Sequence, residues 1–558
     1  MTISSRSKVA ATTVALAAMA LTGCGGGGTT TTPAASGKTG GTATVAMGTA
    51  PDSLDPQFGY TTQAAEADWI AYTPLLTYAH ANGQPGTQLI PGLASDLPTV
   101  SPDGLTYTLQ LRSGLTYSDG TPVKASDFTH AIERAIKINW GGASFFSNYI
   151  VGADTYLKNT APTISGITTD DNSGKITIQL STAYGAFANV LAFPAAALVP
   201  PNTPMTAESN NPPPGVGAYM ITNVTPNVSF VMQKNPRFAA FKIPGIPAGS
   251  LDSIKVNIVS NTQSEAQQVL SNQVDNFDAG DTIPGALLNQ IQSQASSRFT
   301  KEAVATTYYF FLNTTTAPFN NPAARQAVNM ALDRTALARI SSGSLSPGCY
   351  FLPPSIVGHP SAPCPAGDPS QVLSGATVAK AKAMIAQAGL AGTPVTVWSE
   401  TRSPRQDYCV YFAGLLNQLG FKASLKVIQD SVYFQTVGNQ ATNPQTGFAD
   451  WSQDFPNPSD FYLLLDGTAI QAQNNENFGQ VNDPHIQSEL KKLDAVPATK
   501  LSSVSSEWAS LDQYTAQQAY TATMGYETVP KFFSTRIDYG SAVFNPVYYN
   551  DWSTWKLK

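Results

Sequence analysis

The sequence predicts an α/β protein with at least two lobes. Strands and amphipathic helices alternate through its second half, a pattern that indicates βαβ units and a mostly parallel sheet. Its 558 residues are enough for two or three domains. A hydrophobic content of 42% is enough for buried cores, which excludes a disordered chain.

The first half begins with an expected strand at 42–47 and a loop through Asp52 and Pro56. Residues 105–111 alternate between apolar and polar, which predicts a half-buried strand. After a turn at 118–122, we expect Ser126 to cap a helix whose apolar residues share one face. Further strands are expected at 176–180, 228–233 and 254–259.

The second half starts with an aromatic, extended segment at 308–313. Asn321-Pro322 then opens a helix, since proline is favoured in a first helical turn. Helices are also expected at 379–388, 406–419 and near 500–518, and strands at 395–398, 423–428 and near 520–526.

Charge argues against nucleic acid as a partner. Charged residues make up 12% of the chain and the net charge is −6, whereas a nucleic-acid-binding protein needs a basic stripe. No apolar run after the N-terminus approaches the length of a membrane span.

The N-terminus has the layout of a secretory signal peptide, expected at residues 1–23. Arg6 and Lys8 precede a short apolar stretch at 9–21 that is too short to span a bilayer. Leu21-Thr22-Gly23-Cys24 resembles a bacterial lipobox, which implies that Cys24 receives a diacylglyceryl group and becomes the first mature residue. Two acyl chains anchor a protein stably to a membrane. The alternative is a chance cysteine near an ordinary signal peptide.

The residues after Cys24 are expected to form a flexible tether at 24–41, because they are mainly Gly, Thr, Pro, Ala and Ser. Three further cysteines are present, and an exported protein permits disulfides. Cys349 and Cys364 flank a loop rich in Pro and Gly and are the favoured pair, although the other two pairings stay open. Cys409 lies in an expected helix and is interpreted as a buried thiol.

Motifs for catalysis are missing from the sequence. It contains no Gly-x-Ser-x-Gly, His-Glu-x-x-His or phosphate-binding loop, and its four histidines lack metal-ligand spacing. We interpret His80, His130, His359 and His485 as surface or cap residues. Neither an enzyme nor a cofactor nor a metal is expected, although folding could still bring two catalytic carboxylates together.

Several motifs, in order over nearly the whole mature chain, carry a resemblance to a known family. They are Gly41–Ala46 with Ser53–Pro56, Asp103–Arg112 with Asp119–Val123, Gly215–Tyr219, Lys234–Pro236 and Arg325–Arg334. Together they are similar to the peptide/nickel-type extracellular solute-binding proteins of ABC transporters, family 5. Gly215–Tyr219 differs from the family's turn at two positions. Most of these motifs are interpreted as scaffold.

The resemblance implies a two-lobed fold of the type II periplasmic-binding-protein class, cluster C, with an additional domain in lobe I and a hinge between the lobes. Lobe I is expected at 42–60, 186–305 and 527–558, its additional domain at 61–185, and lobe II at 306–526. The chain is expected to cross between the lobes near 306–313 and 526–530, with the ligand between them.

The resemblance also implies binding residues. Trp451 and Asp454 fall on a Trp-x-x-Asp whose carboxylate holds the α-ammonium of a peptide, an interaction that a water-poor cleft strengthens. The alternative is a core tryptophan and a turn carboxylate. Dipeptide-binding relatives place an arginine for the ligand carboxylate near 402–405, so Arg402 and Arg405 are both candidates. Trp398, at a strand end, is expected to wall the cleft.

The function that follows is a lipid-anchored, extracytoplasmic receptor that captures di- or oligopeptides and delivers them to an ABC permease and ATPase. We expect a monomer that uses no catalytic group. Alternative ligands are oligosaccharides and nickel chelates. Alternative classes are a surface peptide sensor or chaperone and a secreted hydrolase.

Overall fold

The computed structural model describes residues 37–278, 280 and 282–558. The expected signal peptide at 1–23, Cys24 and the tether up to residue 36 therefore lie outside the described residues. The strand expected at 42–47 is confirmed with the same bounds.

Eleven strands form the main sheet. Their order is β15 (Lys422–Ile428), β14 (Pro394–Glu400), β16 (Thr446–Ser452), β12 (Phe299–Leu312), β17 (Thr521–Phe533), β11 (Asn276–Phe277), β1 (Thr42–Met47), β10 (Ser253–Ile258), β9 (Ser229–Lys234) and β8 (Tyr219–Thr225), with β13 (Leu345–Pro347) beside β17. The prediction of a mostly parallel sheet is wrong. β1 is parallel to β10 and β11, and β14 to β15 and β16, but the other pairs are antiparallel.

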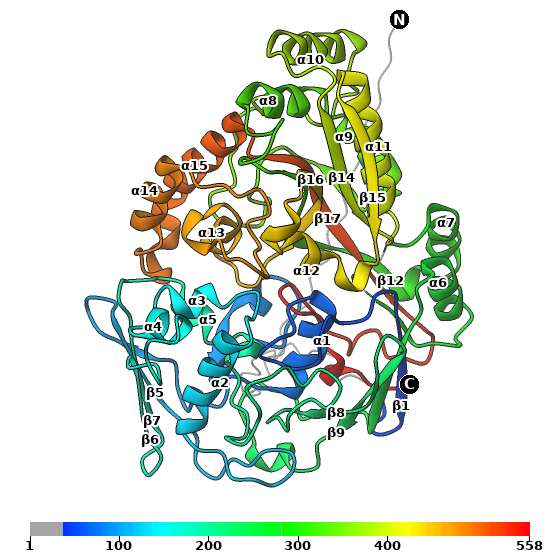
Figure 1. Cartoon of the computed structure of the whole chain (residues 1–558). Coiled ribbons are helices and arrows are strands. Elements are labelled where there is room, and N and C mark those ends of the chain that lie inside the picture. The colour runs from blue at the N-terminus through cyan, green and yellow to red at the C-terminus, as the bar shows by residue number, and fades with distance from the viewer. Residues whose placement is uncertain (1–36, 279, 281) are drawn as a thin grey trace, which may run out of the picture. The chain divides into compact units, whose positions relative to one another are not determined.

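The two longest strands, β12 and β17, run antiparallel through the middle of this sheet (Figure 1). Their register shifts between the pairs Ala303–Thr528 and Thr307–Tyr526, so the ladder is interrupted there. Aromatic side chains of β12 fill the core on the far side of this break. Phe310, for example, stacks on Phe412 with ring centroids 3.9 Å apart.

Helix α11 (Arg405–Leu419) packs on β14, β15 and β16, whereas α8 (Pro322–Ala331) and α9 (Arg334–Ile340) contact β17. Helix α10 (Gly375–Gln387) packs against α8 and α11. The others in this half are α12 (Tyr433–Val437), α13 (Pro458–Tyr462), α14 (Pro484–Leu493) and α15 (Ser505–Gln518). The helix expected near 500–518 is α15, preceded by a 3₁₀ segment at Ala498–Val504. Asn321 caps α8 by accepting a hydrogen bond from the Ala323 amide, with Pro322 in the first turn as predicted.

A separate antiparallel sheet has the order β4 (Thr99–Val100), β5 (Thr106–Gln110), β7 (Lys175–Gln179) and β6 (Ile167–Asp170). The remaining elements are α1 (Thr62–Ala71), β2 (Leu76–Tyr78), β3 (Leu89–Pro91), α2 (Ser126–Lys137), α3 (Ser144–Ser147), α4 (Ala153–Leu157), α5 (Phe187–Val190), α6 (Thr262–Leu270), α7 (Gly285–Gln294), β18 (Phe544–Asn545) and β19 (Tyr549–Asn550).

Three local predictions are wrong. Ser126 is the first residue of α2 and not its cap, because its hydroxyl donates to Asp171, 3.0 Å away. The tether does not extend to residue 41, since the Lys38 amide donates to the Leu557 carbonyl. His80 is not a surface residue. Its side chain is 5% exposed, stacks on Trp69 and lies 2.6 Å from the Asp551 carboxylate.

Cys349 and Cys364 form a disulfide in the structure, with Cα atoms 6.0 Å apart. Cys409 is a fully buried free thiol in α11, as expected, and burial raises its pKa to about 12. This thiol is therefore protonated and unreactive in the folded protein at neutral pH.

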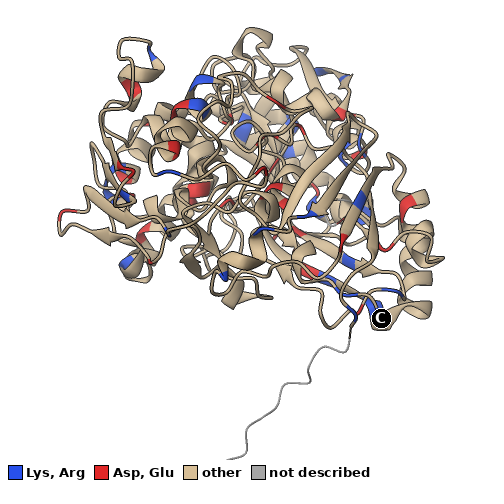
Figure 2. Ribbon diagram, turned by 90° about the horizontal axis from the view of Figure 1, so that it is seen from below, with Lys and Arg blue, Asp and Glu red and all other residues tan. Residues whose placement is uncertain are grey.

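Basic and acidic residues are interspersed in the view of Figure 2, which shows no basic stripe. Across residues 37–278, 280 and 282–558, no helix is both long and apolar enough to cross a bilayer. The same residues contain no cluster of three or more His, Cys, Asp or Glu that could hold a metal ion.

Candidate functional site: a cleft between two walls

A cleft of about 1520 Å³, including its open mouth, lies between two walls. One wall is formed by the loop before α1 and the first turns of that helix, together with Trp140 and Phe193. The other wall is formed by segments at 400–405, 430–435, 450–454 and 474–476. Hydrogen bonds join the walls, including Thr49 Oγ1 to Asp430 Oδ2 at 3.2 Å and Asn474 Nδ2 to the Asn139 carbonyl at 2.6 Å.

The carboxylate of Asp52 shapes the first wall. It accepts hydrogen bonds from the amides of Ser53, Tyr60 and Thr61, and from the Thr61 hydroxyl at 2.9 Å. Thr61 in turn caps α1 by accepting from the Ala64 amide. These bonds close the loop on itself and fix the backbone that carries Tyr60.

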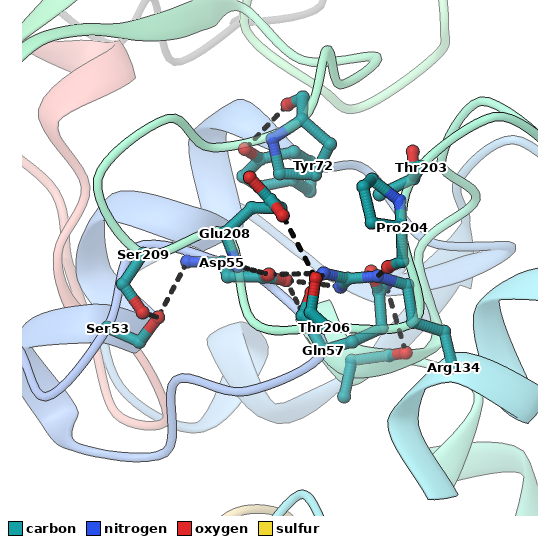
Figure 3. Close-up of polar contacts among 12 residues, drawn as sticks. Ser53, Asp55, Gln57, Tyr72, Arg134, Thr203, Pro204, Thr206, Glu208 and Ser209 are labelled. Carbon is teal, nitrogen blue, oxygen red and sulfur yellow. Dashed lines mark hydrogen bonds and ion pairs between the residues drawn. The ribbon is translucent and has the colours of Figure 1, made fainter. Parts of the chain in front are cut away.

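A buried ion pair holds the base of the same loop (Figure 3). The guanidinium of Arg134, on α2, donates to both oxygens of Asp55 at 2.6 and 2.5 Å and to Gln57 Oε1 at 3.0 Å, and neither partner of the pair is exposed. The Glu208 amide donates to Asp55 as well, at 2.6 Å. Asp55 and Arg134 thus join this loop to α2 and to the segment around Glu208, which makes the Asp55–Arg134 pair a positioning device for the cleft wall.

The second wall carries Trp451 at the end of β16 and Asp454 just beyond it. Asp460 positions both residues, because one of its oxygens accepts from Trp451 Nε1 at 3.2 Å and the other from the Asp454 amide at 2.8 Å. Asp460 is fully buried, and burial raises its pKa well above the usual range.

The carboxyl group of Asp454 faces the cleft and is partly exposed. The Tyr60 hydroxyl, from the opposite wall, donates to its Oδ2 at 2.6 Å. Burial raises the pKa of Asp454 to about 7, because the surroundings disfavour the charged form. The rings of Trp140 and Trp451 lie edge-on to Tyr60, at 5.0 and 5.9 Å between centroids, so this carboxyl group lies beside an aromatic wall.

Glu476 is a second carboxyl group of the cleft that the sequence did not reveal. Burial, followed by the charge of Asp454, raises its pKa to about 8. Two carboxyl groups with raised pKa values on one cleft wall favour a ligand that supplies positive charge.

The two candidate arginines, Arg402 and Arg405, make different interactions in the structure. Arg405 lines the cleft but is committed to Glu400 at 3.0 Å and Asp450 at 2.5 Å, and its guanidinium lies over the Phe448 ring. Arg402 also lines the cleft, and donates to the Gly280 carbonyl. Both arginines therefore reach the cleft, and Arg405 is the one whose ion pairs with Glu400 and Asp450 are defined.

Trp398 is not among the residues that line the cleft. It is 5% exposed, and Lys426 Nζ lies over its ring at 3.6 Å. Trp398 is also not at the strand end, because β14 continues to Glu400, and its side chain packs against a lysine of β15. Asp454, Trp451 and Arg402 are therefore brought together, and Trp398 is not.

The cleft residues that sequence reasoning missed have no local signal. Tyr60 contacts Asp454 across 394 positions of sequence, and Tyr60 lies in no motif that predicts this contact. Trp140 and Glu476 likewise join the cleft only through the fold.

Comparisons with known proteins agree with this architecture. Residues 88–473 match the family model described as bacterial extracellular solute-binding proteins, family 5. The glutathione-binding protein GsiB of Escherichia coli O1:K1 / APEC is 30% identical over 365 residues, which cover 63% of this chain. The match spans 65% of the length of that relative.

Solved structures share the fold at lower sequence identity. The clavulanic acid biosynthesis oligopeptide binding protein 2 superposes with a TM-score of 0.80 at 21% identity, over 93% of this chain and 96% of that protein. OppA of Haemophilus influenzae in complex with the peptide RPPGFSPFR gives 0.78 at 16% identity, over 92% and 98%.

The murein tripeptide binding protein MppA of Escherichia coli gives a TM-score of 0.78 at 20% identity, over 93% of this chain and 99% of MppA. The family and each of these relatives are described as binding proteins and not as enzymes. Because the family model covers more than half of its length, the chain belongs to the bacterial extracellular solute-binding proteins, family 5.

Proposed function

We propose that this protein captures peptides in the cleft and delivers them to the permease of an ABC importer. The observation that carries the proposal is the carboxyl group of Asp454, which faces an aromatic-walled cleft and receives one hydrogen bond, from Tyr60. A peptide α-ammonium supplies the positive charge and the additional donors that such a carboxylate lacks. The names of OppA and of the clavulanic acid relative point to the same ligand class.

Arg402 is the proposed partner for the carboxylate end of a short peptide, since Arg405 already holds Glu400 and Asp450. Trp451 supplies apolar surface beside the α-ammonium. A guanidinium fork suits a planar carboxylate.

We place the boundary between the two lobes where the hydrogen-bond ladder of β12 and β17 is interrupted. Lobe I comprises 42–60, 186–305 and 527–558 with its additional domain at 61–185, and lobe II comprises 306–526. The register shift between Ala303 and Thr307 supports a hinge there, at the start of the expected crossing near 306–313. Closure about this hinge buries the ligand between the walls.

The proposed location is outside the cytoplasmic membrane, where a diacylglyceryl group on Cys24 holds a monomeric receptor beside its permease and ATPase. The lipobox-like sequence at 21–24 supports this part of the proposal.

Isothermal titration of the purified protein with di-, tri- and tetrapeptide mixtures tests the ligand class. We expect saturable binding of at least one mixture. Failure of every peptide mixture, combined with binding of an oligosaccharide or a nickel chelate, would overturn the peptide proposal while leaving the family assignment intact. Turnover of a bound peptide would instead support a hydrolase.

A further inference from the structure

The cleft contains more negative charge than an α-ammonium can neutralise. Among described residues, seven carboxyl groups and two guanidinium groups line it. Arg405 forms ion pairs with Glu400 and Asp450, and Asp52 has four hydrogen bonds from Ser53, Tyr60 and Thr61. Asp430 accepts hydrogen bonds from Thr49, Gln429 and Ser431. The carboxyl groups of the other three, Asp68, Asp454 and Glu476, have no ion pair with the described chain.

Asp68 is the most deeply placed of the three. It is 1% exposed, lines the cleft, and its Oδ1 has no hydrogen-bond partner. It lies beneath Gly59, where an added Cβ would come within 3.4 Å of its Oδ2. Burying a carboxyl oxygen without a hydrogen-bond partner costs free energy. The described chain supplies no donor or cation for this oxygen, so a ligand that brings one into the cleft removes the cost.

The carboxyl group of Glu476 is held at a defined place by its neighbours. Asn475 and Asn477, each 1% exposed, fix the backbone, because Asn475 Nδ2 donates to the Asn477 carbonyl and Asn477 Nδ2 to the Val481 carbonyl, both at 2.8 Å. The side chain of Glu476 itself makes no hydrogen bond or ion pair with the described residues. A rigid backbone that carries a carboxylate without a partner is arranged for a ligand.

Aromatic rings frame this carboxylate. An added Cβ at Gly141 would lie 3.1 Å from Glu476 Oε1 and 2.4 Å from the Tyr60 ring, so both side chains converge on the glycine next to Trp140. Trp140 lies edge-on to Tyr60, with ring centroids 5.0 Å apart. A carboxylate beside such an aromatic pair is a typical environment for an ammonium or guanidinium group.

We propose that Glu476, framed by Tyr60 and Trp140, recognises a cationic side chain of the ligand, separate from the α-ammonium at Asp454. The preferred ligands are then peptides that contain lysine or arginine. This inference rests on the proposed function and specifies its substrate class. Asp68 adds a buried carboxyl oxygen without a hydrogen-bond partner deeper in the same cleft, where a second donor group of the ligand can bind.

The test compares tripeptides of alanine that carry one lysine, at position 1, 2 or 3, with counterparts that carry norleucine, which has the same carbon chain without the amine. Titration calorimetry of the purified full-length mature protein gives the ratio of the two affinities. For at least one position, we expect lysine to bind at least about tenfold more tightly than norleucine.

Glu476→Gln should abolish most of that ratio and leave the affinity for the norleucine peptide within about threefold, since the substitution removes charge but keeps the shape. Glu507→Gln, which removes a carboxylate from the exposed first turn of α15, is the matched control and should leave the ratio unchanged. Asp454→Asn should weaken both peptides alike. Equal affinities at all three positions, or an unchanged ratio in Glu476→Gln, would overturn the inference while the peptide proposal stands.

The peptide proposal can also fail while the cation subsite at Glu476 stands. If the wild-type protein binds none of these peptides, spermidine and agmatine replace them as cationic probes. Binding of either amine that Glu476→Gln weakens would keep the cation subsite and overturn the peptide proposal. Absence of binding by peptides and amines alike would overturn both.

Discussion

The Asp454 carboxyl group has a raised pKa of about 7, and Glu476 one of about 8, because desolvation in the cleft disfavours their charged forms. Their neutral forms are therefore favoured as the pH falls below these values. A cationic ligand binds the ionised forms, whereas the α-ammonium of a peptide stays charged below about pH 7. Binding and proton release are consequently linked.

We therefore expect the affinity for a peptide to fall by at least about tenfold between pH 7 and pH 5. Calorimetry in two buffers with different ionisation enthalpies should show that binding near pH 6 releases protons. Asp454→Asn should remove much of this pH dependence. A wild-type affinity that stays constant from pH 5 to pH 7 would show that the carboxyl groups are not ligand contacts.

The buried pair of Arg134 and Asp55 gives a second prediction for single residues. Arg134→Met leaves the Asp55 carboxylate buried without its cation and should lower the free energy of unfolding by about 3–5 kcal/mol, measured by urea denaturation. The control is Lys158→Met, which removes an exposed pair with Asp154 and should change the same quantity by less than about 1 kcal/mol. Similar losses in the two variants would refute the structural role of the Asp55–Arg134 pair.

At the scale of single elements, the disulfide between Cys349 and Cys364 closes a loop with a sequence separation of 15 residues. The chain-entropy model gives about 3 kcal/mol for a loop of this size. We expect the double variant Cys349→Ser/Cys364→Ser to unfold at a lower temperature than the wild type and to bind ligand normally. Reductant should lower the midpoint of the wild type to that of the variant and have no effect on the variant. A response of the variant to reductant would contradict this assignment.

Local periodicity explains which elements could be predicted from the sequence. A short stretch of sequence is enough to predict the alternation in β5, the apolar face of α2 and the proline in the first turn of α8. The mixed direction of the sheet could not be inferred, because strand direction depends on connections and not on composition. The prediction that Ser126 caps α2 was wrong because the Ser126 hydroxyl donates to Asp171, 45 residues away.

The candidate binding site likewise contains residues that local sequence could predict and residues that it could not. Trp451 and Asp454 are neighbours in one motif, so a resemblance could locate them before the structure was known. Tyr60, Trp140, Glu476 and Asp68 come from segments that only the tertiary fold brings to one cleft. Trp398 was misplaced because β14 continues two residues beyond it, to Glu400, and Lys426 of the neighbouring strand lies over its ring.

At the scale of the whole molecule, anchoring by Cys24 is a separate prediction. Cys24→Ala removes the acyl acceptor, so the protein should move from the membrane fraction to the soluble extracytoplasmic fraction and lose labelling by radioactive palmitate. Its affinity for peptide should not change. Palmitate labelling that persists in this variant would refute lipidation at Cys24.

The central claim is that the closed cleft holds a peptide through its α-ammonium at Asp454. The most direct test is a thermodynamic cycle, measured by calorimetry, that combines Asp454→Ala with N-acetylation of the same peptide. Either change alone should weaken binding at least about tenfold, and the second should cost little once the first is made, because both remove one interaction. Full additivity of the two losses, or an unchanged affinity in Asp454→Ala, would contradict the account.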